Sequence, residues 1–585
     1  MLKIQTPKWY EWIYSYIKKE EAWVYQSLFL GVVYTLLGLV TAFVVQLLID
    51  KFIPQKDYTQ IFYSGLFLIL VFLIKSLAGF LRQRFLIILN KNINTNINAD
   101  FLEHLFKLPK KFFDTRMIGE ITARINDAIR IQRAIWQIIG TSLIDIFVVI
   151  SSFAFMFYFS EMLALLTFFL IPIYGLVLLL SVKKIKEQQN EVMEGYALVE
   201  SNYFDSLKGV DEIMSYNTGN SYSKINKFFF GNYQKKIKTL GFTQSRLNFF
   251  AEIFSSFILV GLLTTGSIWI INGKMLVGDL MAAFTLLSNI IPAVNRFVDA
   301  NIMLQETSIA STRLMDMILV DKECNNGNLP FMLQEKLSIK NGAFSWNGRR
   351  NLFEKVNITI PRGKVTSLWG NSGAGKSTIV QVLQRKYKLH SGSVLCDETD
   401  VEDINLSDYR KNIAVVPQSI KIFNGTIADN ILVGRTIEDI NFLQKRIIEL
   451  DLISFYKRFE FGLYTIIGED GRELSGGEKQ LLSITRALLF NPEVLIIDEG
   501  LSGIDIEFEL MIFELIKKHA QKKAVLLITH NLNSIIKTDF VYVLANGTIL
   551  QKGTPQELIL NNGYFKKMWD MKELIYQNNL VAVNE

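Results

Sequence analysis

Six long apolar stretches in the first half of the chain constrain its fold more than any other feature. Each is close to the roughly 20 residues that a helix needs to cross a hydrocarbon core about 30 Å thick. The stretches lie near residues 23–50, 60–88, 134–158, 162–182, 248–271 and 277–303. This pattern predicts a polytopic membrane domain that crosses the bilayer as six α-helices.

Lysine and arginine are concentrated in one set of the segments between these stretches. The segment before the first stretch carries Lys3, Lys8, Lys18 and Lys19; the connection 89–133 carries Lys107, Lys110, Lys111, Arg116, Arg124 and Arg130; the connection 183–247 carries Lys183, Lys184, Lys186, Lys224, Lys235 and Lys236. Positively charged loops stay on the cytoplasmic side. We therefore expect a multi-pass protein of the bacterial plasma membrane, with its N-terminus and its C-terminal half in the cytoplasm. The first stretch is too long for a cleavable signal peptide.

The composition indicates two unlike halves. Of the 585 residues, 50% are hydrophobic and 20% are charged, which suits neither an ordinary soluble protein nor a purely membranous one. After Lys322, short apolar runs alternate with charge and glycine, as in an α/β domain. We expect a membrane domain over 1–320 and an α/β domain over 335–575. The net charge of +6 is spread out, which favours contact with anionic lipid and argues against a nucleic-acid partner. Cys324 and Cys396 lack metal-ligand spacing, so neither zinc nor a disulfide is expected.

The α/β domain carries a complete phosphate-binding loop. Its residues are Gly370, Asn371, Ser372, Gly373, Ala374, Gly375, Lys376, Ser377 and Thr378. A glycine-rich loop that opens a helix lets backbone N–H groups and the positive helix end surround a polyphosphate. Lys376 then reaches the β- and γ-phosphate oxygens, and Ser377 can ligate Mg²⁺. Alone, this loop predicts only a nucleotide hydrolase.

A rarer motif follows further along the chain. Residues 474–480 are Leu474, Ser475, Gly476, Gly477, Glu478, Lys479 and Gln480. With this motif the chain resembles the ATP-binding cassette (ABC) family. The resemblance implies a P-loop ATPase domain with a helical subdomain, and ATP and Mg²⁺ as cofactors. It also implies that Ser475, Gly476, Gly477 and Glu478 cap the γ-phosphate of an ATP that the partner subunit holds.

Two predicted strands end in residues that match the family's catalytic motifs. The apolar strand 494–497 ends in Asp498 and Glu499, and the apolar strand 524–529 ends in His530. By the resemblance, Asp498 holds Mg²⁺, and Glu499 polarises the water that attacks the γ-phosphate. His530 would bridge the γ-phosphate to the opposite subunit, although a structural histidine is the alternative.

Gln418 and Trp346 also match ATPase motifs. Gln418 would touch Mg²⁺ and the attacking water. Trp346 ends a strand predicted over 339–346, which we expect to pair antiparallel with 356–360. The resemblance implies that its ring stacks on adenine; a buried core tryptophan is the alternative.

Two loops depart from the family pattern. Asp505 lies at the family's D-loop aspartate, but Gly503 and Ile504 replace the usual residues before it. In the cross-linking loop, Ile466 and Asp470 replace the commoner glutamate and arginine. We therefore expect the packing of the first loop and the ion pairs of the second to differ from those of the family.

The long cytosolic connections, 89–133 and 183–247, are typical of exporters. Their helical periodicity predicts that the spans continue as helices beyond the bilayer. Residues 108–127 and 200–217 resemble the two intracellular loops of ABC exporters, with their short coupling helices. This resemblance implies a half-transporter, whose working unit is a dimer of two copies or a heterodimer.

Segments 47–50, 112–116 and 125–128 look most like exporters of bacteriocin-type peptides. We therefore expect ATP-driven export of a peptide by alternating access, in which closure of the ATPase dimer turns the cavity outward and hydrolysis resets it. Many such exporters carry an N-terminal papain-like protease, for which we expect no room before the first span. The alternatives are a lipid or hydrophobic-drug flippase on the same scaffold and a non-transporting ATP-gated regulator.

Lys75 and Asp145 are charged residues inside predicted spans. Both fall near mid-depth, where an ionised side chain that faces lipid is costly. We expect each to face the helix bundle and the two to form a pair. The alternative is that Lys75 reaches a headgroup.

Overall fold

The computed structural model describes residues 9–116, 118–325, 327–346, 351–435, 440–468, 471, 473–499 and 506–571. The chain divides into two compact units. The helical unit comprises Met1–Leu108 and Phe112–Lys322, and the sheet unit comprises Pro109–Lys111 and Glu323–Glu585.

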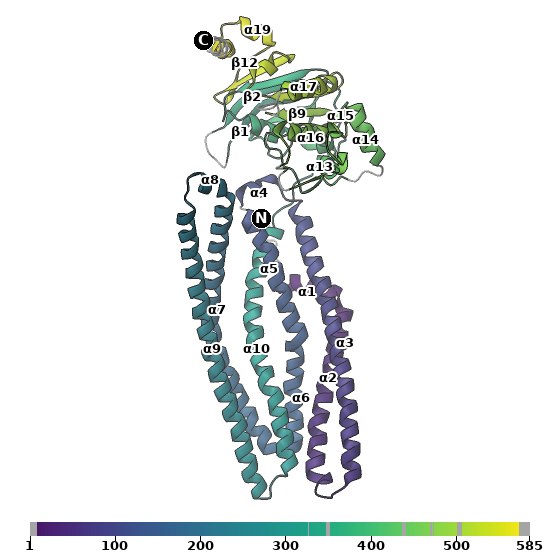
Figure 1. Cartoon of the computed structure of the whole chain (residues 1–585), viewed down its shortest axis with the longest axis vertical. Coiled ribbons are helices and arrows are strands. Elements are labelled where there is room, and N and C mark those ends of the chain that lie inside the picture. Colours follow the sequence, from purple (N-terminus) through teal and green to yellow (C-terminus); the bar gives the residue numbers. More distant parts are fainter. Residues whose placement is uncertain are drawn as a thin grey trace. The chain divides into compact units, whose positions relative to one another are not determined.

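The helical unit is built mainly from long helices (Figure 1). These are α1 (Trp9–Lys19), α2 (Glu21–Leu47), η1 (Leu48–Phe52), α3 (Tyr58–Leu105), α4 (Lys110–Thr115), α5 (Ile118–Gln137), η2 (Ile138–Ser142), α6 (Leu143–Phe159), α7 (Glu161–Lys208), α8 (Val210–Ser215), α9 (Gly219–Ile271) and α10 (Val277–Ile318). The elements η1 and η2 are single π-helical turns that continue α2 and precede α6.

Among the described residues, five helical segments are long and apolar enough to span a membrane. They are Glu21–Phe52, Tyr58–Leu105, Gly119–Phe159, Gly219–Ile271 and Val277–Ile318. The shorter apolar segment Glu161–Leu176, at the start of α7, overlaps the predicted span 162–182. The six predicted spans therefore each lie on an apolar helix.

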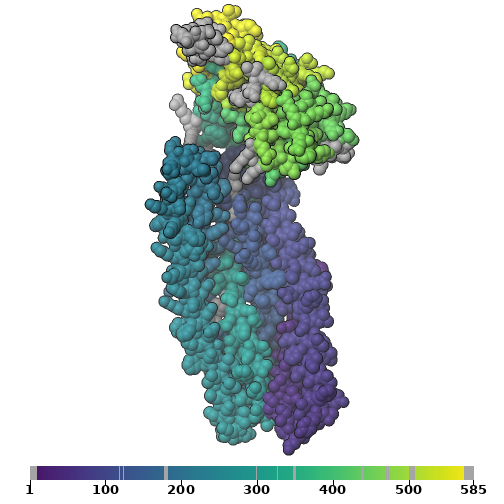
Figure 2. Space-filling model, viewed as in Figure 1, coloured from purple at the N-terminus to yellow at the C-terminus, as the bar shows by residue number. Residues whose placement is uncertain are grey.

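Four helices are much longer than a bilayer core is thick. Helices α3 and α7 have 48 residues each, α9 has 53 and α10 has 42. At 1.5 Å per residue they measure about 60–80 Å, against a core of about 30 Å. Helices α7 and α9 lie side by side over much of their length and are joined by the short α8 (Figure 1). In the space-filling view they form a continuous blue-to-teal column (Figure 2).

Two apolar cores hold the helical unit together. One joins α2, α6, α7, α9 and α10 and contains fully buried leucines such as Leu163, Leu262 and Leu286. The other joins α1, α3, α5 and α10. The amphipathic helix α1 buries Ile13 and Tyr16 in this second core, and the Tyr16 hydroxyl donates to Asp100 Oδ2 of α3 at 2.9 Å. Helix α1 is therefore fixed against the membrane helices.

The sheet unit contains a four-stranded antiparallel sheet and a six-stranded, mainly parallel sheet. The first has the order β2-β1-β4-β5, with β1 (Lys336–Phe344), β2 (Phe353–Pro361), β4 (Ser391–Cys396) and β5 (Thr399–Asp400). Strands β1 and β2 are the predicted antiparallel pair. Trp346 lies two residues after the end of β1.

The second sheet has the order β12-β11-β3-β10-β9-β6. Its strands are β3 (Val365–Gly370), β6 (Ile413–Val416), β9 (Val494–Asp498), β10 (Ala524–Ile528), β11 (Phe540–Ala545) and β12 (Thr548–Gly553). All neighbours pair in parallel except β11 and β12. Every residue of β3, β9 and β10 is buried, as expected for parallel strands covered on both faces. The carboxyl ends of these strands meet at one edge of the sheet.

Short helices complete the sheet unit. They are α11 (Lys376–Leu383), α12 (Leu406–Asn412), α13 (Ile427–Leu432), α14 (Ile440–Glu449), α15 (Ile453–Tyr456), α16 (Gly476–Leu488), α17 (Ile506–Ala520), α18 (Leu532–Ile535) and α19 (Pro555–Leu560), with the turns η3 (Val401–Asp403) and η4 (Gly462–Tyr464) and the hairpin β7 (Gly425–Thr426) and β8 (Ile466–Ile467). Helices α13 to α17 share one apolar core with residues of β3, β6, β9 and β10.

Candidate functional site

The phosphate loop connects β3 to α11. Gly373 and Gly375 have φ of 80° and 99°, in the left-handed region that favours glycine. Gly375 is the N-cap of α11 and offers no side-chain acceptor, so the first N–H groups of the helix face the loop without a cap. The Lys376 Nζ donates to the carbonyls of Gly370 and Asn371, both at 2.9 Å. The loop therefore combines free backbone donors with a cation, as a polyphosphate site requires.

The other loop residues line the same turn. Asn371, Ser372, Gly373 and Ser377 are exposed, and Thr378 is buried. The Asn371 Nδ2 donates to the hydroxyl of Tyr564 at 2.9 Å. This tether to the C-terminal region was not predicted from the sequence.

Glu499, directly after β9, is contacted by three side chains from other segments of the sheet unit. Its Oε2 accepts from Gln418 Nε2 at 2.5 Å, and its Oε1 lies 3.8 Å from Lys376 Nζ. The same Oε1 contacts Nε2 of His530. Glu499 itself has a φ of 55°, a left-handed conformation that is costly for a non-glycine residue and is common at functional sites. The structure thus brings together four residues that the sequence placed in the active site.

Asp498 lies beside this cluster and is only 7% exposed. Burial raises the pKa of its carboxyl, the Glu499 carboxylate raises it further, and a hydrogen bond from the Ser377 hydroxyl opposes the rise. The Asp498 Oδ1 is buried and has no hydrogen-bond partner among the described residues. Burial also lowers the pKa of Lys376, and the Glu499 carboxylate opposes this shift.

This donor set fits Mg²⁺. Mg²⁺ prefers oxygen ligands and is held in ATPases by one or two side chains together with substrate phosphates and water. Ser377 and Asp498 supply two adjacent oxygens, one of them an unpartnered carboxylate oxygen. Among the described residues there is no group of three or more His, Cys, Asp or Glu that could hold a metal without phosphate.

Trp346 packs edge-on against two aromatic rings. Its ring centroid lies 4.9 Å from that of Tyr387 and 5.1 Å from that of Phe344. The side chain is half-buried, so part of the ring remains accessible for stacking. Tyr387 was not singled out from the sequence.

The signature motif begins helix α16. Ser475 is the N-cap: its Oγ accepts from the Glu478 N–H at 3.3 Å, and the Glu478 carboxylate accepts from the Ser475 N–H at 2.7 Å. This is a capping box, and the S-x-x-E spacing could have predicted it. A Cβ added at Gly477 would lie 2.8 Å from the Phe508 ring, so any larger residue at this position would require that ring to move. In the described part of the chain, no hydrogen bond joins Ser475 or Glu478 to the phosphate loop.

Several predicted positions lie outside the described residues. These are the D-loop residues Ser502 to Asp505 and, in the cross-linking loop, Glu469 and Asp470.

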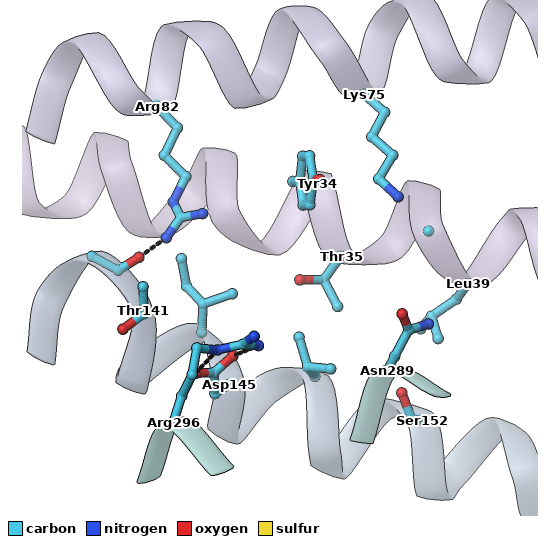
Figure 3. Close-up of a pocket in the computed structure, with 14 residues that line it drawn as sticks. Tyr34, Thr35, Leu39, Lys75, Arg82, Thr141, Asp145, Ser152, Asn289 and Arg296 are labelled. Carbon is cyan, nitrogen blue, oxygen red and sulfur yellow. Dashed lines mark hydrogen bonds and ion pairs between the residues drawn. The ribbon is translucent and has the colours of Figure 1, made fainter. Parts of the chain in front are cut away.

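In the helical unit the structure corrects the predicted Lys75–Asp145 pair. Asp145, 4% exposed, accepts from Arg296 Nε at 2.9 Å and from Arg296 Nη2 at 2.6 Å (Figure 3). The Lys75 Nζ instead lies over the Tyr34 ring, 4.8 Å from its centroid. The predicted pair is therefore wrong, because a guanidinium on α10 satisfies both carboxylate oxygens at once. Both residues do face the helix bundle, and both line one pocket.

Two family models match the chain. Residues 24–293 match the ABC transporter transmembrane region, and residues 353–502 match the ABC transporter model. The chain belongs to the ABC transporters. This transporter is therefore a membrane protein that binds ATP and couples its hydrolysis to transport.

Relatives extend over nearly the whole transporter. It is 29% identical to the lactococcin-G-processing and transport ATP-binding protein LagD of Lactococcus lactis, over 91% of this chain and 76% of LagD. It is 26% identical to the uncharacterized ABC transporter ATP-binding protein YwjA of Bacillus subtilis, over 95% of this chain and 97% of YwjA. Its fold matches the structure of a bacterial Atm1-family ABC exporter with ATP bound, with a TM-score of 0.84 at 20% identity, covering 95% of this chain and 99% of that one. The fold is that of an ABC exporter.

Proposed function

We propose that this transporter exports a peptide across the bacterial cell membrane, working as a homodimer. The observation that carries the peptide assignment is the similarity to proteins named for bacteriocin transport, which includes both the membrane and the ATPase regions. The likeness to LagD spans 541 residues, so it is not confined to the ATPase motifs that all ABC proteins share.

The strand-end cluster supports a division of roles in hydrolysis. Lys376 and the loop N–H groups neutralise the β- and γ-phosphate oxygens, and Ser377, Gln418 and Asp498 would hold Mg²⁺, which supplies further charge neutralisation. Glu499 orients the attacking water and accepts its proton. His530, which contacts Glu499, keeps the carboxylate aimed at this edge of the sheet.

We propose a dimer because the signature residues Ser475 and Glu478, within one subunit, cap their own helix α16 and do not bond to the phosphate loop of the same chain in the described residues. A signature that serves the partner's ATP fits this arrangement.

Mixing two inactive variants tests the dimer. Ser475→Asp keeps a strong N-cap but places a carboxylate against the partner's phosphates. Lys376→Ala removes the phosphate cation. Co-assembly of these two chains gives one site with both lesions and one with neither, so we expect ATPase activity to return. Mixed dimers, isolated through two different affinity tags, that remain as inactive as each variant alone would argue against sites shared between subunits.

Reconstituted vesicles test the substrate class. We expect ATPase activity to rise with added peptide from a panel of bacteriocin precursors, and labelled peptide to accumulate inside inside-out vesicles only when ATP is present. Glu499→Gln is the matched control, because it should abolish accumulation without removing the phosphate loop. Stimulation by lipids or hydrophobic drugs, with none by peptides, would refute the peptide assignment.

A lipid or hydrophobic compound remains the second candidate because the helical unit also contains an apolar pocket. This pocket, about 400 Å³ in volume, lies beside Pro172 of α7 and is lined by residues such as Val149, Phe153 and Leu176. The same vesicle assay separates the two candidates.

A further inference from the structure

A polar pocket of about 350 Å³ lies among α2, α3, η2, α6 and α10 of the helical unit (Figure 3). Its volume is in the range of small-molecule binding sites. Four charged side chains line it: Lys75 and Arg82 of α3, Asp145 of α6 and Arg296 of α10. Tyr34, Thr35, Ser152 and Asn289 add hydroxyl and amide groups.

The charges in this pocket do not balance. Asp145 is the carboxylate of the lining, and Arg296 binds both of its oxygens. Lys75 and Arg82 therefore leave two positive charges without a countercharge. Among the described residues, neither cation has a carboxylate within the 4.0 Å limit of an ion pair.

The two cations also keep unused hydrogen-bond donors. Arg82 donates through one terminal nitrogen to the Gly140 carbonyl, but its Nε is buried and has no partner among the described residues. Lys75 makes a cation–π contact with Tyr34, and Gly38 leaves space beside its ammonium group. Unpaired cations within a membrane are costly, and they are kept where they serve a pathway or a ligand.

The spacing of the cations restricts the ligand. Lys75 and Arg82 are seven residues apart on α3, which places them on the same face and about 10 Å apart along the helix. In an extended peptide, side chains two positions apart point to the same side and lie about 7 Å apart, and the long side chains of Lys75 and Arg82 can close the remaining distance. A lipid headgroup with a single phosphate presents one compact charge instead of two separated charges.

We propose that this pocket is a binding site for an acidic, extended segment of the exported peptide, with two carboxylates two residues apart that pair with Lys75 and Arg82. This inference rests on the proposed function, because it takes the cargo to be a peptide. The hydroxyl and amide groups of Thr35, Ser152 and Asn289 bond the peptide backbone between the two carboxylates.

The first test measures peptide binding to the unmodified, full-length transporter in phosphatidylcholine nanodiscs without nucleotide. It uses three labelled octapeptides. The first peptide has two glutamates two positions apart, the second has glutamines there, and the third has two adjacent glutamates, whose side chains point to opposite sides of an extended chain. Fluorescence anisotropy gives the dissociation constants. We expect the first peptide to bind at least about tenfold more tightly than the second, and more tightly than the third. Equal affinities of the first two peptides would overturn the proposal.

Substitutions then locate the site. Lys75→Gln and Arg82→Gln should each weaken the first peptide by about fivefold to tenfold and leave the diglutamine peptide unchanged. Lys91→Gln is the matched control, because Lys91 lies on the same helix, is exposed and is outside the pocket. Unchanged affinity in both pocket variants, with melting temperatures that show them folded, would place the peptide elsewhere and overturn the proposal.

Two further measurements separate this inference from the proposed function. The first adds phosphatidylglycerol to the nanodisc and measures whether it displaces the first peptide. Displacement from the unmodified protein but not from Arg82→Gln would mean that the pocket binds a lipid headgroup, and the peptide assignment of the pocket would be wrong. If peptides stimulate ATPase activity in vesicles irrespective of their glutamates, peptide export stands and the pocket inference fails. If no peptide binds or stimulates, both fail.

Discussion

The Asp145–Arg296 pair should dominate the stability of the polar pocket. Substitution of Arg296 should lower the melting temperature more than substitution of Asp145. Asp145 is 4% exposed, whereas the Arg296 side chain is 40% exposed. Arg296→Met strands a buried carboxylate, at a cost of about 3–5 kcal/mol, which lowers the melting temperature by about 6–10 °C at roughly 2 °C per kcal/mol. Asp145→Asn keeps a polar acceptor for Arg296, whose charge is less buried than the carboxylate, so this change should cost only about 1–2 kcal/mol.

The double variant measures the pairing itself. Asp145→Asn with Arg296→Met removes both charges, so its melting temperature should fall by less than the sum of the single changes, by an amount equivalent to about 2 kcal/mol. Melting curves at one fixed scan rate in one detergent make the four proteins comparable. The control is Lys75→Gln combined with Asp145→Asn, which should be additive within about 0.5 kcal/mol. Additive losses for Asp145 and Arg296, or coupling between Asp145 and Lys75, would refute the pairing seen in the structure.

Three further predictions concern the sheet unit. Glu499→Gln should bind ATP at least as tightly as the unmodified protein but hydrolyse it at least about 100-fold more slowly, measured by nucleotide binding and phosphate release; near-normal turnover would refute Glu499 as the base. Asp498→Asn should raise the melting temperature in the absence of Mg²⁺ and ATP, because burial raises the pKa of Asp498 and its ionised form therefore costs stability. This gain in melting temperature should be fully present above the pKa that Asp498 has in the folded protein, and it should vanish as the pH falls to the pKa that Asp498 has in the unfolded chain. An equal gain at all pH values would show that the ionisation of Asp498 is not the cause. Gly477→Ala should destabilise by about 1–3 kcal/mol, because its Cβ would lie 2.8 Å from the Phe508 ring. In a Phe508→Ala background the same change should be neutral or stabilising, and an unchanged loss in thermal melts would exclude this contact as the cause.

The ATPase cluster could be predicted because its residues follow local patterns. Glu499 directly follows the buried strand β9, and His530 lies two residues after the end of the buried strand β10. Lys376 begins a helix that follows another strand of the same sheet. Parallel strands place their carboxyl ends at one edge, so residues that follow them converge without any knowledge of long-range packing. The capping box of Ser475 and Glu478 follows the same kind of local rule.

The partner of Asp145 could not be predicted in this way. Position along a span gives the depth of a residue but not the helix face that meets a given neighbour. Arg296 is 151 residues away on α10, and its contact with Asp145 depends on how α6 and α10 pack. Judged by depth in the membrane alone, Lys75 is as good a partner for Asp145 as Arg296 is. The packing of α2 against α3 instead places the Tyr34 ring under the Lys75 ammonium group.

The electrostatics of the strand-end cluster predict that one substitution, Glu499→Gln, separates ATP binding from hydrolysis. Lys376 is buried, which lowers its pKa, and the Glu499 carboxylate 3.8 Å away partly offsets this. The same carboxylate raises the pKa of Asp498 and repels any phosphate that approaches Lys376. Replacing Glu499 by glutamine removes this repulsion but also removes one counterion of Lys376, so phosphate oxygens become the main groups that can neutralise the lysine. The proposed base is therefore also a group that opposes tight binding of ATP.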